Sequence, residues 1–370
     1  MYNSISYISI VFFLSISSVV IGQKYSAYYG EVMVGKVVKH RDGLLYDVPP
    51  VSMIFQGGKQ IQTDGSKAWH QYWGYPRLER SIHFNVFGDA DVLGYAVGAA
   101  PGVGFYIFRG NRSAVLLHMG AGFAYLTKEY NALTNPNNNA IGSNFNNTTQ
   151  VKLSFETPIV NALSLDIGVG ITHYSNGLSS SPNSGINIIG LHIGLKPTIP
   201  IRRISESDEL PQPKVISRRW GVNGFVSYGV AEKGVPGGPK YPIKNYSIGV
   251  YYKANPFLKW HAGLDYDYAL SDYEFAIRDF QTEETADGLA TSTAAYAAVE
   301  GIFGSVSFRY QMGYYLDLLY DRSESVPYSK FNIIYNIPYD LYEVRPYVGI
   351  LLKTHVAVAD YVALQVGVEW

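Results

Sequence analysis

The chain is 370 residues long, with 16% charged and 15% aromatic residues, and its 29 basic and 30 acidic side chains leave a formal net charge of -1. Because charged residues usually make up about 25% of a soluble domain, this composition excludes a disordered chain, and the balanced charge offers no basic surface to a nucleic-acid partner. The absence of cysteine excludes disulfides, thiolate metal sites and a cysteine nucleophile, and a mean hydropathy of -0.01 is too low for a bundle of membrane-spanning helices.

The N-terminal segment has the pattern of an export signal. Residues 8–21 are apolar, with serines interspersed, and are followed by the small Gly22 and the polar pair Gln23 and Lys24. This order predicts a signal peptide over residues 1–22. The missing positive charge before Ile8 leaves an uncleaved anchor as the alternative. Either interpretation takes the chain out of the cytoplasm.

The following chain alternates apolar and polar side chains with a period of two, which is the pattern of β-strands. It recurs in residues 246–253, 264–268 and 302–312. The clearest case is the last segment, where one face carries Val362, Leu364, Val366, Val368 and Trp370, and the other carries Ala363, Gln365, Gly367 and Glu369. Charged side chains share the polar face, and we expect a hydrated lumen network or a pore lining from Asp265, Asp267, Arg309 and Glu369.

These strands favour an all-β, antiparallel transmembrane barrel over a secreted soluble β protein. Export, strands of about ten residues with aromatic residues near their ends, and a chain that stops on Trp370 within a strand are typical of outer-membrane barrels. We predict one barrel of about 14–16 strands, with two smaller barrels in tandem as the alternative. Polar residues 201–217 are predicted to connect residues 23–200 to C-terminal strands over 218–370. The expected location is the outer membrane of a Gram-negative bacterium.

Short and long connections alternate between the predicted strands. The turns at 157–161 and 254–256 are short, whereas the connections 127–150, 230–244 and 270–291 are long and polar. Outer-membrane barrels place short turns in the periplasm and long loops outside the cell. A strand that begins after the turn at 157–161 therefore ends at the extracellular rim.

Two neighbouring strands carry polar residues on a face that is otherwise apolar. The strand over residues 163–175 continues its apolar face into His173 and Ser175, and on its partner strand the same face begins with Asn187. If the connection between them closes about Ser180, His173 lies directly opposite Asn187, and opposed residues are roughly 5 Å apart. We therefore expect these three side chains to meet on the outer wall.

A serine, a histidine and an asparagine in mutual contact have the chemistry of a serine hydrolase. In this hypothesis Ser175 attacks, His173 takes its proton and Asn187 holds the histidine tautomer. The oxyanion needs hydrogen-bond donors, and the candidates are Asn176, through its amide or backbone N–H, and the adjacent Gly177. The alternative is that His173 is an interfacial polar residue and Ser175 a loop residue, as is usual at barrel rims.

Three short runs around this site carry a family resemblance: His173-Tyr174-Ser175-Asn176, Pro182-Asn183-x-Gly185-Ile186 and Ala140-Ile141-Gly142-Ser143. Over roughly residues 78–197 the chain resembles the lipid A 3-O-deacylase (PagL) family, outer-membrane barrels that remove an ester-linked acyl chain from lipopolysaccharide. The resemblance implies that residues 23–200 are a deacylase-like barrel region. It also implies a carboxylic ester hydrolase that remodels lipid A.

One residue departs from that family, which has a glutamate where this chain has Asn187. Outer-membrane phospholipase A is similar in this respect, since its His-x-Ser-Asn-Gly run matches His173, Ser175, Asn176 and Gly177, and its triad has an asparagine at the spacing of Asn187. A carboxylate would hold an imidazolium by charge, whereas an amide orients it only by its dipole. Phospholipid is therefore the alternative substrate, and a non-catalytic, porin-like barrel is the second alternative.

The metal and partner predictions follow from the same comparison. Phospholipase A is calcium-dependent and dimeric at its site, but Ser181, Asn183 and Ser184 offer only neutral oxygens, a weak ligand set for Ca²⁺. We expect no obligatory metal and no cofactor, and a homodimer remains open. The expected partners are lipid A or phospholipid and the outer membrane itself, without nucleic acid.

Two further features have simpler explanations. The cluster Trp69-His70-Gln71-Tyr72-Trp73 is predicted to be a packed aromatic girdle or plug, with sugar stacking as the alternative. His192 falls on the inner face and is predicted to line the lumen rather than to bind a ligand.

Overall fold

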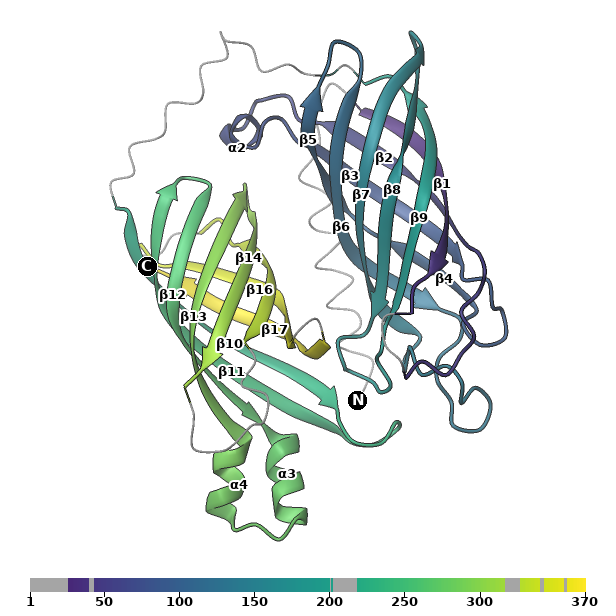
Figure 1. Ribbon diagram of the computed structural model, residues 1–370. Coiled ribbons are helices and arrows are strands. Elements are labelled where there is room, and N and C mark those ends of the chain that lie inside the picture. Colours follow the sequence, from purple (N-terminus) through teal and green to yellow (C-terminus); the bar gives the residue numbers. More distant parts are fainter. Residues whose placement is uncertain are drawn as a thin grey trace.

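The structure is a computed structural model, and it describes residues 26–39, 43–199, 201, 218–316, 327–339, 343–355 and 358–370. The predicted signal peptide, residues 1–22, lies outside the described residues, as does most of the predicted connection 201–217. The described chain forms two closed antiparallel β-barrels, one on each side of that connection (Figure 1).

Nine strands form the first barrel within the described residues: β1 (Ser26–Val37), β2 (Ser52–Gln62), β3 (Arg77–Val86), β4 (Tyr95–Ala99), β5 (Gly102–Arg109), β6 (Ala114–Leu126), β7 (Phe145–Val160), β8 (Leu163–Ser175) and β9 (Ile186–Pro197). β4 and β5 both pair with β3 and β6, so together they occupy one position in the wall. Pro101 lies between them and cannot donate to a ladder. The wall closes through the pairs β1–β9, β1–β2 and β2–β3.

The second barrel contains eight strands in the part of the chain that the structure describes: β10 (Trp220–Glu232), β11 (Lys240–Asn255), β12 (Leu258–Ala269), β13 (Thr291–Phe303), β14 (Val306–Tyr315), β15 (Tyr328–Asn336), β16 (Arg345–His355) and β17 (Val358–Glu369). Each strand pairs with its neighbour in sequence, and β10 pairs with β17 to close the ring.

The predicted all-β barrel class is confirmed, and the arrangement is the tandem one that we held as the alternative. One barrel of about 14–16 strands is not formed, because the first and last strands of each half pair with each other. Val32 of β1 faces Ile193 of β9, and Val226 of β10 faces Val366 of β17. The edge strands of each half are therefore hydrogen-bonded within that half, and no unpaired edge among the described strands is available to join the two halves into one barrel.

Side chains alternate between an apolar outer wall and a polar interior, as predicted. On β17, Val366 is 59% exposed and the adjacent Gln365 only 1%. An exposed apolar band of this kind suits contact with lipid rather than with water. The polar side chains of the interior are buried, which is expected because side chains fill the inside of a ring of eight strands.

Buried ion pairs cross both lumens. Arg77 Nη1 lies 2.5 Å from Glu156 Oε2 in the first barrel, and Arg309 Nη2 lies 2.7 Å from Glu300 Oε2 in the second. His192 also faces inward, 3.2 Å from Asp166 Oδ1, as predicted for a lumen residue. Buried ion pairs or hydrogen bonds hold all four of the residues that we predicted to share the inner face, Asp265, Asp267, Arg309 and Glu369.

The loops differ from the predicted ones in length and content. The connection 270–291, which we predicted to be long and polar, contains two helices, α3 (Leu270–Arg278) and α4 (Glu283–Ala290). The connections predicted over 230–244 and 127–150 are shorter, covering 233–239 and 127–144, because the flanking strands are longer than predicted. Among the described residues, no helix has the length and apolar character needed to cross a membrane.

Helix α2 (Ala68–Tyr72), between β2 and β3, brings the two barrels into contact at the end that carries the short turns (Figure 1). Trp73, just after the helix, stacks on Phe303 with ring centroids 4.7 Å apart, and its Nε1 donates to Ile302 O at 2.9 Å. Trp69 packs edge-on against Phe303 at 6.1 Å. The aromatic cluster is thus packed, as predicted, but against the second barrel rather than as a girdle or plug.

Candidate active site at the rim of the first barrel

The predicted histidine and asparagine lie opposite each other on β8 and β9. His173 is in register with Asn187, and its Nδ1 is 2.6 Å from Asn187 Oδ1. Both side chains continue the outer apolar face, whose neighbouring members Ile171 and Ile189 are exposed on the barrel wall. The period of two and the loop between the strands together produce this contact.

The Asn187 contact determines the histidine tautomer. An amide oxygen has no proton and can only accept, so Nδ1 of His173 must carry the hydrogen and donate it. The second ring nitrogen, Nε2, is then unprotonated in the neutral imidazole and can accept a proton. A histidine in this state is suited to act as a general base.

Ser175 lies two residues beyond His173 on the same outer face of β8. Its hydroxyl donates to Asn147 Oδ1 at 3.0 Å, and the side chain is only 5% exposed. Asn147 faces Ser175 across the β7–β8 ladder. The sequence pattern did not single out Asn147, because its register with Ser175 depends on an irregularity between Pro158 and Val160 near the turn.

The two residues after Ser175 have partners on other segments. Asn176 N donates to Asn183 Oδ1 at 3.0 Å, and Asn176 Nδ2 donates to Ser143 Oγ at 3.0 Å. Asn176 therefore connects the β8–β9 loop, residues 176–185, to the β6–β7 loop. Gly177, the other candidate for oxyanion binding, faces the second barrel and has no room for a Cβ beside Val362.

Gly185 supports the imidazole from the other end of the loop. Its φ is +78°, a conformation that side-chain-bearing residues rarely adopt, and its N–H donates to Ala140 O at 2.9 Å. A Cβ at this position would lie 2.8 Å from His173 Cε1. The glycine therefore allows the loop to pass close against the ring.

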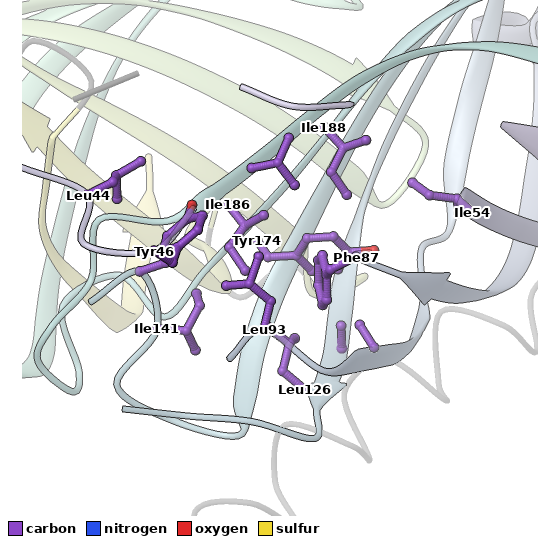
Figure 2. Packing of buried hydrophobic residues seen from close by; sticks show 14 of the residues in the cluster. Leu44, Tyr46, Ile54, Phe87, Leu93, Leu126, Ile141, Tyr174, Ile186 and Ile188 are labelled. Atoms are coloured by element: carbon purple, nitrogen blue, oxygen red, sulfur yellow. The ribbon is translucent and has the colours of Figure 1, made fainter. Parts of the chain in front are cut away.

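Tyr174, between the two candidate catalytic residues, points into the barrel and anchors the end of β8. It is fully buried in an apolar cluster with Phe87, Leu93 and Ile186 (Figure 2). The cluster lies on the side of β8 and β9 that faces away from His173 and Asn187. The outward positions of His173 and Ser175 are therefore backed by a rigid core on the inner side.

A possible metal-binding group lies elsewhere, inside the second barrel. His261, Glu300 and Glu369 are the one such group of three among the described residues. Lys259 and Arg309 already contact these carboxylates at 2.6 and 2.7 Å, so the negative charge is neutralised by protein cations. We assign this group to lumen packing.

Two closed β-barrels with an apolar outer wall and a polar interior define a class, that of outer-membrane β-barrel proteins. Residues 55–196 match the family model described as lipid A 3-O-deacylase (PagL), and residues 219–370 match the one described as acyloxyacyl hydrolase, C-terminal domain. The chain belongs to this lipid A deacylase and acyloxyacyl hydrolase family. It is an outer-membrane protein of a Gram-negative bacterium.

Solved structures resemble the chain more distantly. The outer membrane enzyme PagL is 20% identical, with 45% of this chain and 97% of that chain covered and a TM-score of 0.33. A BenF-like porin from Pseudomonas fluorescens Pf-5 is 7% identical, with 94% and 97% covered and a TM-score of 0.22. CdiB from Acinetobacter baumannii is 7% identical, with 93% and 60% covered and a TM-score of 0.20. A search of the curated proteins gave no match.

Proposed function

We propose that this protein is an outer-membrane serine esterase that removes an ester-linked acyl chain from lipid A. The observation that carries the proposal is the 2.6 Å contact between His173 Nδ1 and Asn187 Oδ1, with Ser175 next along the same outer face. This is the base and orienter arrangement of a hydrolytic triad. The family match over residues 55–196 includes all three positions.

The reaction would proceed through an acyl-enzyme. Ser175 Oγ attacks the ester carbonyl carbon while His173 Nε2 takes the hydroxyl proton, and the resulting imidazolium then donates it to the sugar oxygen that leaves. Water, whose proton His173 Nε2 takes, then attacks the acyl carbon; the bond to Ser175 Oγ breaks, the imidazolium returns the proton to that oxygen, and the fatty acid leaves. The oxyanion in both steps is stabilised by N–H groups of Asn176 and Gly177.

Substrate binding must change two hydrogen bonds of the resting site. Ser175 Oγ now donates to Asn147, so its proton has to turn towards His173 before attack. The backbone N–H of Asn176 now donates to Asn183 Oδ1, so Asn183 has to release it for an oxyanion. Catalytic hydrogen bonds of free enzymes often form only in the substrate complex.

The position of the site suits a substrate in the outer leaflet. β8 follows a short turn and ends at the long-loop end of the barrel, which in such barrels is extracellular. The side chains of Ile171 and Ile189 lie exposed on the same wall, one alternation below the polar pair. We propose that acyl chains lie along this wall while the ester reaches Ser175 from the side.

The direct test is deacylation by the purified full chain in detergent micelles containing lipopolysaccharide. Mass spectrometry of the lipid A should show the loss of one ester-linked acyl group, with a matching fatty acid released and the amide-linked chains retained. Unchanged lipid A in a correctly folded sample would rule out the proposal.

Phospholipid is the alternative substrate, and Asn187 is the residue that favours it, since it replaces the glutamate of the deacylases. In vesicles that contain phospholipid alone, a phospholipase would accumulate lysophospholipid. A porin-like barrel would instead conduct ions in planar bilayers with no hydrolysis of either lipid. The three products are different, so one set of samples separates these functions.

Asn187 offers a test of the tautomer argument. Asn187→Leu keeps the volume but removes the acceptor, so His173 can present its protonated nitrogen to Ser175, and we expect kcat to fall by about 10²–10⁴. Asn187→Asp keeps an acceptor for Nδ1 and should retain activity within about tenfold of the parent. Equal kcat values for the two variants would contradict the role of Asn187.

Gly185 offers a test of the ring position. Gly185→Ala places a methyl group against His173 Cε1 and strains the left-handed backbone, so the imidazole must move and we expect kcat to fall by about 10–10². Gly30→Ala is the matched control, because a Cβ at Gly30 would meet nothing within 4 Å. Kinetic constants for both variants check the prediction, and full activity of Gly185→Ala would show that the ring position is not critical.

A further inference from the structure

The chain makes a strained turn immediately after the candidate nucleophile. Ser179 N donates to Asn176 O at 3.3 Å, which closes a turn over residues 176–179. Its two central residues have positive φ angles, +63° at Gly177 and +67° at Leu178. Glycine adopts this conformation freely, but for leucine the Cβ crowds the backbone, so Leu178 must be held there by its surroundings.

The surroundings that hold Leu178 belong to the second barrel. Glu232 N, at the end of β10, donates to Leu178 O at 2.9 Å. The Leu178 side chain packs against a buried cluster of the second barrel that includes Ala231, Ile243 and Tyr361. A backbone hydrogen bond and apolar packing thus hold Leu178, the one residue of the turn that does not favour the left-handed conformation.

Three more contacts join the β8–β9 loop to the second barrel. Gly177 lies so close to Val362 of β17 that a Cβ would overlap its side chain. Ser181 Oγ donates to Glu232 O at 2.9 Å, and Lys240 Nζ donates to Ser180 Oγ at 3.1 Å. Residues from β10, β11 and β17 therefore contact the β8–β9 loop along its first half.

We propose that the second barrel is a positioning partner for the active site of the first barrel. It holds the turn at residues 176–179 in its left-handed conformation and thereby sets where the N–H groups of Asn176 and Gly177 point relative to Ser175. Leu178, Lys240 and Val362 are then positioning residues, which touch no substrate. This inference rests on the proposed function and assigns a role to residues 218–370.

The test weakens the docking contacts from the side of the second barrel. The double variant Val362→Ser with Lys240→Met, called the docking variant below, removes the apolar contact with Gly177 and the hydrogen bond to Ser180. The matched control is Val366→Ser with Lys233→Met, because Val366 is lipid-facing on the same strand and Lys233 contacts Asp272 and Asp360 of its own barrel. Circular dichroism and resistance to unfolding confirm that both variants are folded.

We expect the docking variant to lose about 10–10² in kcat on lipid A with KM changed less than about threefold, and the control to keep the parental kcat. Adding Leu178→Gly to the docking variant should restore kcat, because glycine adopts the left-handed turn without help. A general loss of stability would not be repaired by a glycine in a loop.

The outcomes separate the inference from the proposed function. If the docking variant keeps full kcat, or if Leu178→Gly fails to restore it, the positioning role is wrong while the esterase assignment stands. If the parent chain hydrolyses no ester at all, the proposed function fails first. Restoration by Leu178→Gly, together with an unaffected control, supports the inference.

Discussion

Ser175→Ala is expected to reduce lipid A deacylation by at least about 10³-fold. The alanine lacks the oxygen that attacks the ester, and the remaining groups can only bind and polarise the substrate. Folding should be unaffected, because the hydroxyl makes a single hydrogen bond, to Asn147, at the rim of the barrel. Mass spectrometry of lipid A after incubation with equal amounts of folded parent and variant measures the effect.

The matched control for this experiment is Ser179→Ala, four residues further along. Ser179 contributes its backbone N–H to the turn, which alanine retains, and its side chain has no part in the proposed chemistry. We expect parental activity from this variant. Deacylation by Ser175→Ala at a rate near the parent's would show that another residue is the nucleophile.

Glu300→Leu is expected to destabilise the second barrel by about 3–5 kcal/mol. Glu300 is fully buried, and its Oε2 accepts from Arg309 Nε at 2.8 Å and lies 3.0 Å from His261 Nε2. Removing one partner leaves a buried guanidinium without its main counter-charge, which costs more than the pair itself contributes. Urea unfolding in detergent micelles, followed by tryptophan fluorescence, measures the change in free energy.

An exposed glutamate provides the comparison. Glu343 pairs with Arg218 at 3.3 Å on the surface, where both side chains are solvated, so Glu343→Gln should change stability by less than about 1 kcal/mol. If Glu300→Leu unfolds at the same urea concentration as the parent, the lumen ion pairs are not major contributors to stability. Proteolysis would show which barrel opens first.

Local patterns predicted the pairing of the two strands that carry the candidate site. The predicted contact between Ser175 and His173 stays a prediction, because the Ser175 hydroxyl donates to Asn147 in the structure. The alternation along residues 163–175 and 187–195 put His173, Ser175 and Asn187 on one face, and closure of the loop near Ser180 put the histidine opposite the asparagine, as the structure has it. These features depend on a side-chain period of two and on the length of one loop. Both features can be read from residues close together in the sequence, so predicting them required no knowledge of distant contacts.

Other parts of the site depend on residues far apart in sequence. Asn147 contacts Ser175 only because β7 and β8 are in a particular register, and Ser143 reaches Asn176 from a different loop. Leu178 has no unusual sequence context, and its left-handed conformation follows from contact with Glu232, 54 positions further along the chain. No pattern within the loop signals that contact.

By itself, the sequence determined the strand pattern, the inward and outward faces and the pairing of His173 with Asn187, because each is set by spacing over a few residues. Only the tertiary structure decided that the strands close into two rings instead of one, since apolar alternation is the same for any partner and closure depends on which distant edges meet. For the same reason, only the tertiary structure revealed that the second ring supports the loop beside Ser175.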